Sequence, residues 1–596
     1  MKKYLFIALA LLGMASCAKD DLNAGNKPNH NGEIEESYIA INLMAADSDT
    51  RAAEDAYGYD QGTAAERVVN TAYFFFFDAQ GNPFYVNTTN TPATQPGANT
   101  QTNHLSLTIS ENDDPASNLP NVSDIKKAVL ILETYKGVYP SQIVAVINWV
   151  PNANAYTLAA LHEALVSLNG PENGFVMSNS VYMDGAGNMV DAVPLTAANI
   201  KTTADAAKAA PVEIYVERVA AKVVLTASGK VDGTTNIFDT QKNTTPVVSA
   251  GQSSDIDVYV QLHGWELYNE NNQSYLLKDI DPAWDVTALG LTWNDIPYYR
   301  SYWADSQSRT ESDTFSWSYA TDAYPTIYGF KVADSLSKNG DAYTYTDGTY
   351  TYCGENTGVS TVSTIEDKTV VTPYTNNTKV ILKGQLMQKN GDNYESLELA
   401  RWYGTEYAGE EALRIAVANS LKYTLFSSPD GNDFDPIEPA DLMCVAGSVV
   451  GADAYEVGFQ LSSTTNNGTN KTWYQYDSTQ GYVLFGTADD HVSNTNATNT
   501  YLKSVQPALL YKTGQTYYIV DIEHLGTKTA KYGVVRNHVY QIDINSITGY
   551  GSPVYNGTGN IIDPEYPEVE DESSYVAAKI NVLSWKIVKQ SVDIVQ

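Results

Sequence analysis

The residues of this chain that could do chemistry do not form any familiar catalytic pattern. The 596 residues include three Cys, seven His and 70 Asp and Glu. There is no GxSxG, HExxH, phosphate-binding loop or dinucleotide-binding glycine motif, and no CxxC or Cys/His cluster for zinc. A glycosidase needs two carboxylates facing one cleft, and no pair stands out. We therefore expect no enzyme activity, no metal site and no cofactor.

The first cysteine stands where chemistry would be done on the chain itself. Residues 1–16 begin with a basic pair after Met1, continue with an apolar run and end in small residues. This is typical of an export signal and is too short to span a membrane. The Ala-Ser pair before Cys17 resembles a bacterial lipobox, in which a peptidase cuts before the Cys and the thiol is acylated. An ordinary secretory signal with a chance Cys is the alternative.

Two other features allow a chemical interpretation. Cys353 and Cys444 could form a disulfide in an oxidising compartment, and the sequence leaves this open. The loop 428–436 is rich in Asp but lacks the glycine and the terminal glutamate that a calcium hand requires at set positions. A turn is the expected structure there.

Composition limits the class of protein. The formal net charge is −34, with 36 Lys and Arg, which argues against binding to nucleic acid or to anionic membranes. The 43 Tyr, with recurring Thr, Val, Asn and Gly, favour strands and turns over helices. We predict a mainly β fold with two tandem domains of packed antiparallel sheets and a few short helices.

The elements follow from local patterns. The turn at 78–83 between two apolar runs predicts a hairpin over 68–86. One helix is expected at 156–170, ended by Gly170. A strong strand over Val212–Ala227 is expected to close the first domain. Further strands are expected at 104–110, 126–135, 141–150, 255–269, 377–390, 515–524 and 537–551.

Alternating patterns predict one strand shortly after the export signal and another at the C-terminal end of the sequence. In the segment 37–46 every second residue is apolar, so Ile39, Ile41, Leu43 and Ala45 share one face. A polar, acidic, Pro-containing linker at 556–574 precedes the last segment, 575–596. The apolar residues that share parity in that last segment are Val576, Ala578, Ile580, Val582, Val588, Val592 and Ile594.

Several stretches resemble a known family. Pro211–Leu225, Val534–Pro553 and Tyr575–Ile594 are similar to signatures of the fimbrillins, the type V pilin subunits of the Bacteroidales, and Gly174–Asp184 is similar to part of their first domain. The resemblance is closest to the shaft subunits of the minor (short) fimbriae of Porphyromonas. It implies two transthyretin-like β-sandwich domains. Residues from about 280 to 500 match nothing.

The family resemblance implies an assembly cycle. The precursor is exported as a lipoprotein through Cys17, and an Arg-specific surface protease cuts after an exposed Arg, for which Arg51–Ala52 is the matching position. The first strand then leaves, and the C-terminal segment of another subunit fills the groove. Arg67 is the rival cleavage site. The alternative for the tail is that it forms the last strand of its own C-terminal domain.

The resulting prediction is a structural fimbrial shaft subunit that supports adhesion from the cell surface. Its partners would be other copies of itself, accessory anchor and tip subunits, the protease, and host or bacterial surface ligands, with outer-membrane attachment through lipid on the precursor. The alternatives are an anchor or tip subunit, or a monomeric surface lipoprotein that binds glycans through aromatic patches at 262–269 and 291–305. The predicted segments are 1–16 signal peptide, 17–51 propeptide with a removable strand, 52–228 and 229–555 sandwich domains, 556–574 linker and 575–596 donor strand.

Overall fold

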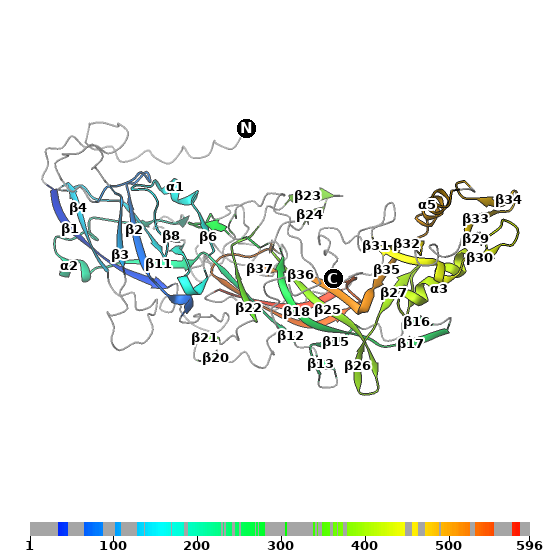
Figure 1. Ribbon diagram of the computed structural model, residues 1–596. Helices are drawn as coiled ribbons and strands as arrows, with labels where there is room; N and C mark the ends of the chain where they lie inside the picture. The colour runs from blue at the N-terminus through cyan, green and yellow to red at the C-terminus, as the bar shows by residue number, and fades with distance from the viewer. Residues whose placement is uncertain are drawn as a thin grey trace.

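The protein is almost entirely built of strands, which confirms the predicted mainly β fold with a few short helices. Our computed structural model (Figure 1) describes nine ranges, with short gaps inside some of them, and the single residues 304 and 306. No helix in these parts of the chain is long and apolar enough to cross a membrane. The described ranges are 34–45, 65–86, 102–108, 128–279, 338–446, 456–462, 471–524, 531–553 and 575–584.

The N-terminal part is one eight-stranded sheet that is covered on both faces. The run of four Phe in its second strand shows why: Phe74 and Phe76 pack in a first core on one face, while Phe75 and Phe77 pack in a smaller core on the other. Successive residues of a strand point to opposite faces, so a strand buried on both sides reads as a continuous apolar run. In sheet order the strands are β3 (His104–Thr108), β2 (Thr71–Phe77), β5 (Gln142–Ile147), β7 (Met177–Asn179), β11 (Val212–Arg218), β1 (Ile34–Ala45) and β4 (Ala128–Tyr135), with β10 (Val193–Pro194) beside β5.

The middle of the molecule is a sandwich of two sheets that enclose a second core. Fully buried Val223, Trp265 and Ile542 come from three different strands of this core. One sheet has the order β22 (Tyr350–Cys353), β12 (Ala221–Ala227), β39 (His538–Thr548) and β41 (Tyr575–Ser584). The other has the order β15 (Ile237–Asp239), β18 (Val258–Tyr268), β25 (Lys379–Asn390), β36 (Gln515–Asp521) and β40 (Ser552–Pro553), with β26 (Asn393–Ser396) beside β25.

A third core lies at the end of the molecule away from β1 (Figure 1). It contains Trp473 and residues of two helices, and it lies within the part of the chain that the sequence left unmatched. One sheet here has the order β17 (Gln252–Ile256), β16 (Thr245–Ser249), β28 (Thr405–Tyr407), β27 (Leu399–Trp402), β35 (Ala508–Tyr511), β32 (Glu456–Leu461) and β31 (Leu442–Ala446). The other has the order β30 (Asp435–Pro436), β29 (Leu425–Ser428), β33 (Thr472–Asp477) and β34 (Gly481–Leu484).

The remaining elements are short. The described helices are α1 (Leu158–His162), α2 (Ala204–Lys208), α3 (Gly409–Leu421) and α5 (His491–Leu502), with 3-10 turns η1 (Ala65–Arg67), η3 (Pro171–Asn173), η7 (Pro439–Asp441) and η8 (Lys512–Gly514). Two-stranded pairs are β6 (Leu165–Ser167) with β19 (Gln273–Tyr275), β8 (Tyr182–Met183) with β9 (Met189–Val190), β13 (Lys230–Val231) with β14 (Thr234–Thr235), β20 (Lys338–Asn339) with β21 (Ala342–Tyr343), β23 (Thr361–Ile365) with β24 (Lys368–Thr372), and β37 (Glu523–His524) with β38 (Lys531–Tyr532).

The predicted helix at 156–170 is wrong over most of its length. The Thr157 hydroxyl accepts a hydrogen bond from the amide of Ala160 and caps α1, but the helix ends after five residues. Val166 is then buried in a strand that pairs with β19. Tertiary pairing with a segment more than 100 residues away overrides the local helical pattern.

The predicted single strand over Val212–Ala227 is two strands in two different sheets. β11 joins the N-terminal sheet and β12 joins the sandwich, and the chain crosses between them at Val219–Ala220. The Ala220 carbonyl accepts a hydrogen bond from the Asn537 amide at 2.6 Å. Most strand pairs are antiparallel, but β11 pairs in parallel with β1, and β12 pairs in parallel with β39.

Candidate assembly site

β1 is an interior strand of the N-terminal sheet and not an edge strand. It lies between β11, which runs parallel to it, and β4, which runs antiparallel. A sheet that lost this strand would present unpaired backbone N–H and C=O groups on both neighbours. The strand extends over Ile34–Ala45, three residues earlier at its start and one earlier at its end than the alternating pattern indicated.

The two neighbours of β1 are staggered along it. β4 pairs with residues 34–41 and β11 with residues 41–45, so Ile41 is the one residue in register with both. Among the described strands, β4 pairs with β1 alone. β1 therefore acts as a splint that holds β4 in the sheet.

The predicted face of β1 points inward where its side chains are described. Ile39 and Ile41 are fully buried in the first core. Each contributes about 1.5–3 kcal/mol through burial. The backbones of Leu43 and Ala45 pair with Ile214 and Val216. The structure describes only the backbone of β1 after Ile41.

Cys17 precedes the described residues, which begin at Ile34, and Arg51 and Ala52 lie in the gap between Ala45 and Ala65. Acylation of Cys17 and cleavage after Arg51 therefore stay predictions. The described residues on the far side of this gap do show how the chain is held after it.

Glu66, in the turn η1, is buried together with a lysine from the sandwich. Its carboxylate lies 2.7 Å from the ammonium of Lys222 in β12, and both side chains are fully buried. The Tyr352 hydroxyl in β22 donates to the same carboxylate, and the Arg218 guanidinium in β11 donates to the Glu66 carbonyl at 2.8 Å. Burial, followed by the Glu66 charge, raises the pKa of Tyr352 far above its usual range. We call these four residues the Glu66 node.

The Glu66 node joins three parts of the molecule that are distant in sequence. It connects the segment just before β2 to the last residue of β11 and to the first sheet of the sandwich. The Lys222 ammonium also lies 4.2 Å from the centre of the Tyr350 ring. Loss of one partner of a buried ion pair leaves the other charge buried at a high cost in free energy. The node therefore holds the turn η1, just before β2, against the sandwich.

Sequence reasoning missed this node, although a signal for it exists. In the run 219–227 the only charged residue is Lys222, and the strand is buried at every position. Lysine is almost never fully buried unless it is paired, so an apolar strand with one Lys predicts a hidden carboxylate partner. The sequence does not say which of the 70 acidic residues it is.

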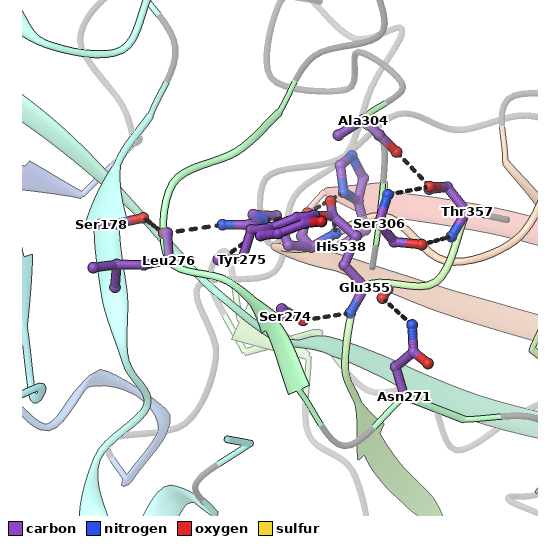
Figure 2. Close-up of polar contacts among 11 residues, drawn as sticks. Ser178, Asn271, Ser274, Tyr275, Leu276, Ala304, Ser306, Glu355, Thr357 and His538 are labelled. Atoms are coloured by element: carbon purple, nitrogen blue, oxygen red, sulfur yellow. Dashed lines mark hydrogen bonds and ion pairs between the residues drawn. The ribbon is translucent and has the colours of Figure 1, made fainter. Parts of the chain in front are cut away.

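A second buried ion pair holds the N-terminal sheet against the sandwich. Arg536, just before β39, lies 2.8 Å from Glu355 and donates to the carbonyls of Tyr275 and Leu276 at 2.7 and 3.2 Å. Figure 2 shows that the Leu276 carbonyl also accepts from Ser178, a residue of β7, at 2.6 Å. β39 is therefore anchored at its start to the N-terminal sheet.

His538, at the first position of β39, is buried beside other basic groups. Its Nδ1 donates to the Arg536 carbonyl at 2.6 Å, and its ring lies edge-on to His524 at 4.9 Å. The Tyr540 hydroxyl accepts from the Val535 amide at 2.8 Å and also shares a hydrogen bond of 2.9 Å with Nδ1 of His524. Burial, then His524 and Lys278, hold the pKa of His538 well below its usual value.

We expect acid to destabilise the protein through His538. The pKa of His538 is lower in the folded chain than in the unfolded chain. As the pH falls below about 6.5, the unfolded chain therefore binds a proton at this histidine and the folded chain does not. The free energy of unfolding then falls by up to about 1.4 kcal/mol per pH unit. His538→Asn keeps a donor near the Nδ1 position and cannot titrate. Urea unfolding between about pH 7 and 5 should show a shallower loss of stability for the variant. Equal slopes for the two proteins would contradict the prediction.

The first half of the tail is paired with its own body. β41 runs antiparallel to β39 at the edge of the sandwich sheet. The predicted donor positions Val576, Ala578, Ile580 and Val582 are in register with Ile547, Ile544, Ile542 and Tyr540, all of which are fully buried. Val588, Val592 and Ile594 lie outside the described residues.

Other candidate residues have structural positions. Trp265, in the aromatic patch 262–269, is a core residue of the sandwich and is 1% exposed, so it is not available to stack on a sugar. Most of the patch 291–305 lies outside the described residues. Cys353 and Cys444 are both buried, lie in two different cores and are not joined by a disulfide. In the loop 428–436 the Asp430 carboxylate accepts from backbone amides, which confirms the predicted turn.

Comparison with known proteins finds one family match. Residues 509–591 match the family model described as "Major fimbrial subunit protein type IV, Fimbrillin, C-terminal". The matched region runs from β35 to the tail and contains both β39 and β41. No curated protein matches the sequence.

Three of the solved structures that are similar to this chain are named here for comparison. They are a putative cell adhesion protein from Parabacteroides distasonis (12% identity, 93% of this chain and 98% of that chain, TM-score 0.34), a fimbrilin from Porphyromonas gingivalis (14%, 93% and 98%, TM-score 0.32), and a tip fimbrial protein from P. gingivalis with C-terminal truncation (10%, 92% and 100%, TM-score 0.25). All three TM-scores are below 0.5.

Proposed function

We propose that this chain is a fimbrial shaft subunit that polymerises by strand exchange. The match of residues 509–591 to the C-terminal model of the fimbrillin family supports its place among fimbrial subunits. The chain is exported as a lipoprotein through Cys17 and cut after Arg51. β1 then leaves the N-terminal sheet, and the tail of another copy takes its place.

The interior position of β1 carries this proposal. An interior strand contributes pairing to two neighbours, so its loss opens a slot that only another strand can fill by β-augmentation. A replacement would have to run parallel to β11 and antiparallel to β4, and would have to bury apolar side chains where Ile39 and Ile41 now lie. The tail meets the pattern requirement, since it offers ten strand residues against the twelve of β1.

The Glu66 node favours Arg51 over Arg67 as the cleavage site. A cut after Arg67 would separate Glu66 from the body and leave Lys222 buried without its carboxylate. Losing one partner of a buried pair costs about 3–5 kcal/mol. A cut after Arg51 removes β1 and leaves the node intact.

The tail and the cleavage site also separate the possible roles within a fimbrium. A tip subunit ordinarily lacks a donor tail, whereas this chain has an alternating segment at 575–596. An anchor ordinarily keeps its lipid and is not cut. The family match includes both the tail strand and β39, which supports an assembly role for this pair.

The experiment treats the purified precursor with an Arg-specific protease and follows it by native gel electrophoresis and negative-stain microscopy. We expect ladders or filaments whose subunits begin at Ala52. Arg51→Ala should stay monomeric under the same treatment, and Arg67→Ala should polymerise like the wild type. Trimming of the wild type at Arg51 to a stable monomer that never assembles would refute the proposal.

Cleavage should also release β4. Because β4 has no other strand partner among the described residues, removal of β1 leaves it held by side-chain packing and by the Glu133 amide, which donates to the Val86 carbonyl at 2.9 Å. We expect amide hydrogen exchange in Ala128–Tyr135 to accelerate after cleavage far more than exchange in β5, and to slow again in the polymer. Unchanged exchange in β4 after loss of β1 would contradict the splint role.

A further inference from the structure

The small sheet β30–β29–β33–β34, at the end of the molecule away from β1 (Figure 1), has two different faces. Leu425 and Trp473 point inward and are fully buried in the third core. The neighbouring positions on these strands, which point to the opposite face, carry aromatic side chains. Phe426 is paired with Tyr474, and Tyr476 is paired with Tyr482. The outer face is therefore aromatic.

These outer rings, with Phe434 from the β29–β30 connection, form a continuous surface. Phe434 stacks on Tyr482 with 3.8 Å between ring centres, and Phe426 and Tyr476 meet Tyr482 edge-on at 5.0 and 5.3 Å. Tyr476 and Tyr482 are 44% and 41% exposed. We call Phe426, Phe434, Tyr474, Tyr476 and Tyr482 the aromatic platform.

Exposed carboxylates lie next to the platform residues in the sequence. Asp430, Asp433 and Asp435 are exposed in the β29–β30 segment, and Asp477 is exposed at the end of β33. Backbone amides of Asn432 and Asp433 hold the pKa of Asp430 below its usual value, so this charge persists in mildly acidic surroundings.

The two segments that carry the platform and these carboxylates contain no basic residue. Neither 423–441 nor 472–490 contains a Lys or Arg. The two flanking lysines are engaged elsewhere: Lys471 pairs with Asp441 at 2.9 Å, and Lys422 lies over the ring of Tyr423 at 5.0 Å. The platform is thus an aromatic face whose own segments carry carboxylates and no basic side chain.

We propose that the aromatic platform binds a basic polypeptide segment that carries Arg or Lys on a partner protein. Charge complementarity selects this occupant. Guanidinium and ammonium groups are attracted to the faces of Tyr and Phe rings, and carboxylates beside those rings bind the same cations. The net charge of −34 disfavours anionic glycans and a second copy of this acidic chain. The proposal is independent of strand exchange.

The test measures binding of a fluorescent, alternating Arg-Gly peptide to the full chain by fluorescence anisotropy. A peptide in which citrulline replaces Arg keeps the shape and removes the charge, and we expect it to bind at least roughly tenfold more weakly. Tyr476→Ser with Tyr482→Ser should weaken binding of the Arg peptide by a similar factor. Asp433→Asn with Asp477→Asn should weaken it and flatten its dependence on salt.

The matched control is Tyr403→Ser, because Tyr403 is 72% exposed and lies in the β27–β28 turn outside the platform. We expect this variant to bind as the wild type does. Equal binding of the Arg and citrulline peptides, equal loss in the Tyr403 variant, or no binding of the Arg peptide would overturn the proposal. Competition by a neutral oligosaccharide alone would assign the platform to glycans instead.

Discussion

Replacing Lys222 with Met is expected to lower the free energy of unfolding by about 3–5 kcal/mol. The substitution keeps the length and the apolar stem of the side chain and removes only the charge. Glu66 then remains fully buried and loses the ammonium group of its ion pair, although the Tyr352 hydroxyl still donates to its carboxylate. Urea unfolding followed by circular dichroism at neutral pH measures the loss.

The companion variant shows that the loss comes from the stranded charge and not from packing. Glu66→Leu, Lys222→Met and Tyr352→Phe together replace the ion pair and the hydroxyl bonded to it by apolar groups of similar size, while Arg218 keeps its bond to the backbone carbonyl of residue 66. Buried ion pairs replaced in this way are often neutral or stabilising, so the triple variant should recover most of the lost stability. A single variant as stable as the wild type, or a triple variant no better than the single, would argue against a coupled node.

The second large effect is expected in the tail. Ile580→Asp with Val582→Asp should abolish polymerisation of the cleaved subunit while leaving cleavage after Arg51 unchanged. These positions are in register with the buried Ile542 and Tyr540 in the precursor, and the proposed cycle buries them in a neighbour's slot. Burying a carboxylate in an apolar core without a partner costs several kcal/mol, more than one strand can offset.

The matched control carries the same number of new charges on the same strand. Ala577 and Asn581 are in register with Ser546 and Gln541, so Ala577→Asp with Asn581→Asp adds two carboxylates at alternate positions. We expect this control to polymerise. Filament length by negative-stain microscopy and ladder formation on native gels give the readout. Polymers from the Ile580 and Val582 variant would rule out this half of the tail as the donor.

Local patterns in the sequence were enough to predict the class of fold and the strands near the two ends. The alternating pattern that places Ile39 and Ile41 on one face predicted a strand, and both side chains are fully buried in β1. The same reasoning found β39 and β41, because a period of two is a local property that a sequence displays directly. The family resemblance seen at Val534–Pro553 and in the tail coincides with the region that matches the fimbrillin model.

Local patterns failed where tertiary pairing decided the outcome. The run Val212–Ala227 reads as one strand because both halves are apolar, and nothing local marks the crossing at Val219–Ala220 between two sheets. Val166 follows a helical pattern and yet forms a strand, because its partner lies in β19. Only the folded chain brings such partners together.

The position of β1 in the sheet, and the contacts that hold the chain around Glu66, follow from tertiary packing. Sequence predicted a strand before Arg51 but could not state that β1 would be interior, parallel to β11 and staggered against β4. The sequence shows Lys222 within an apolar run but does not identify its partner, because Glu66 is 156 residues away. Periodicity determines whether a segment is a strand, whereas neighbours, register and the pairing of buried charges depend on contacts between distant residues, and only the packed chain specifies those.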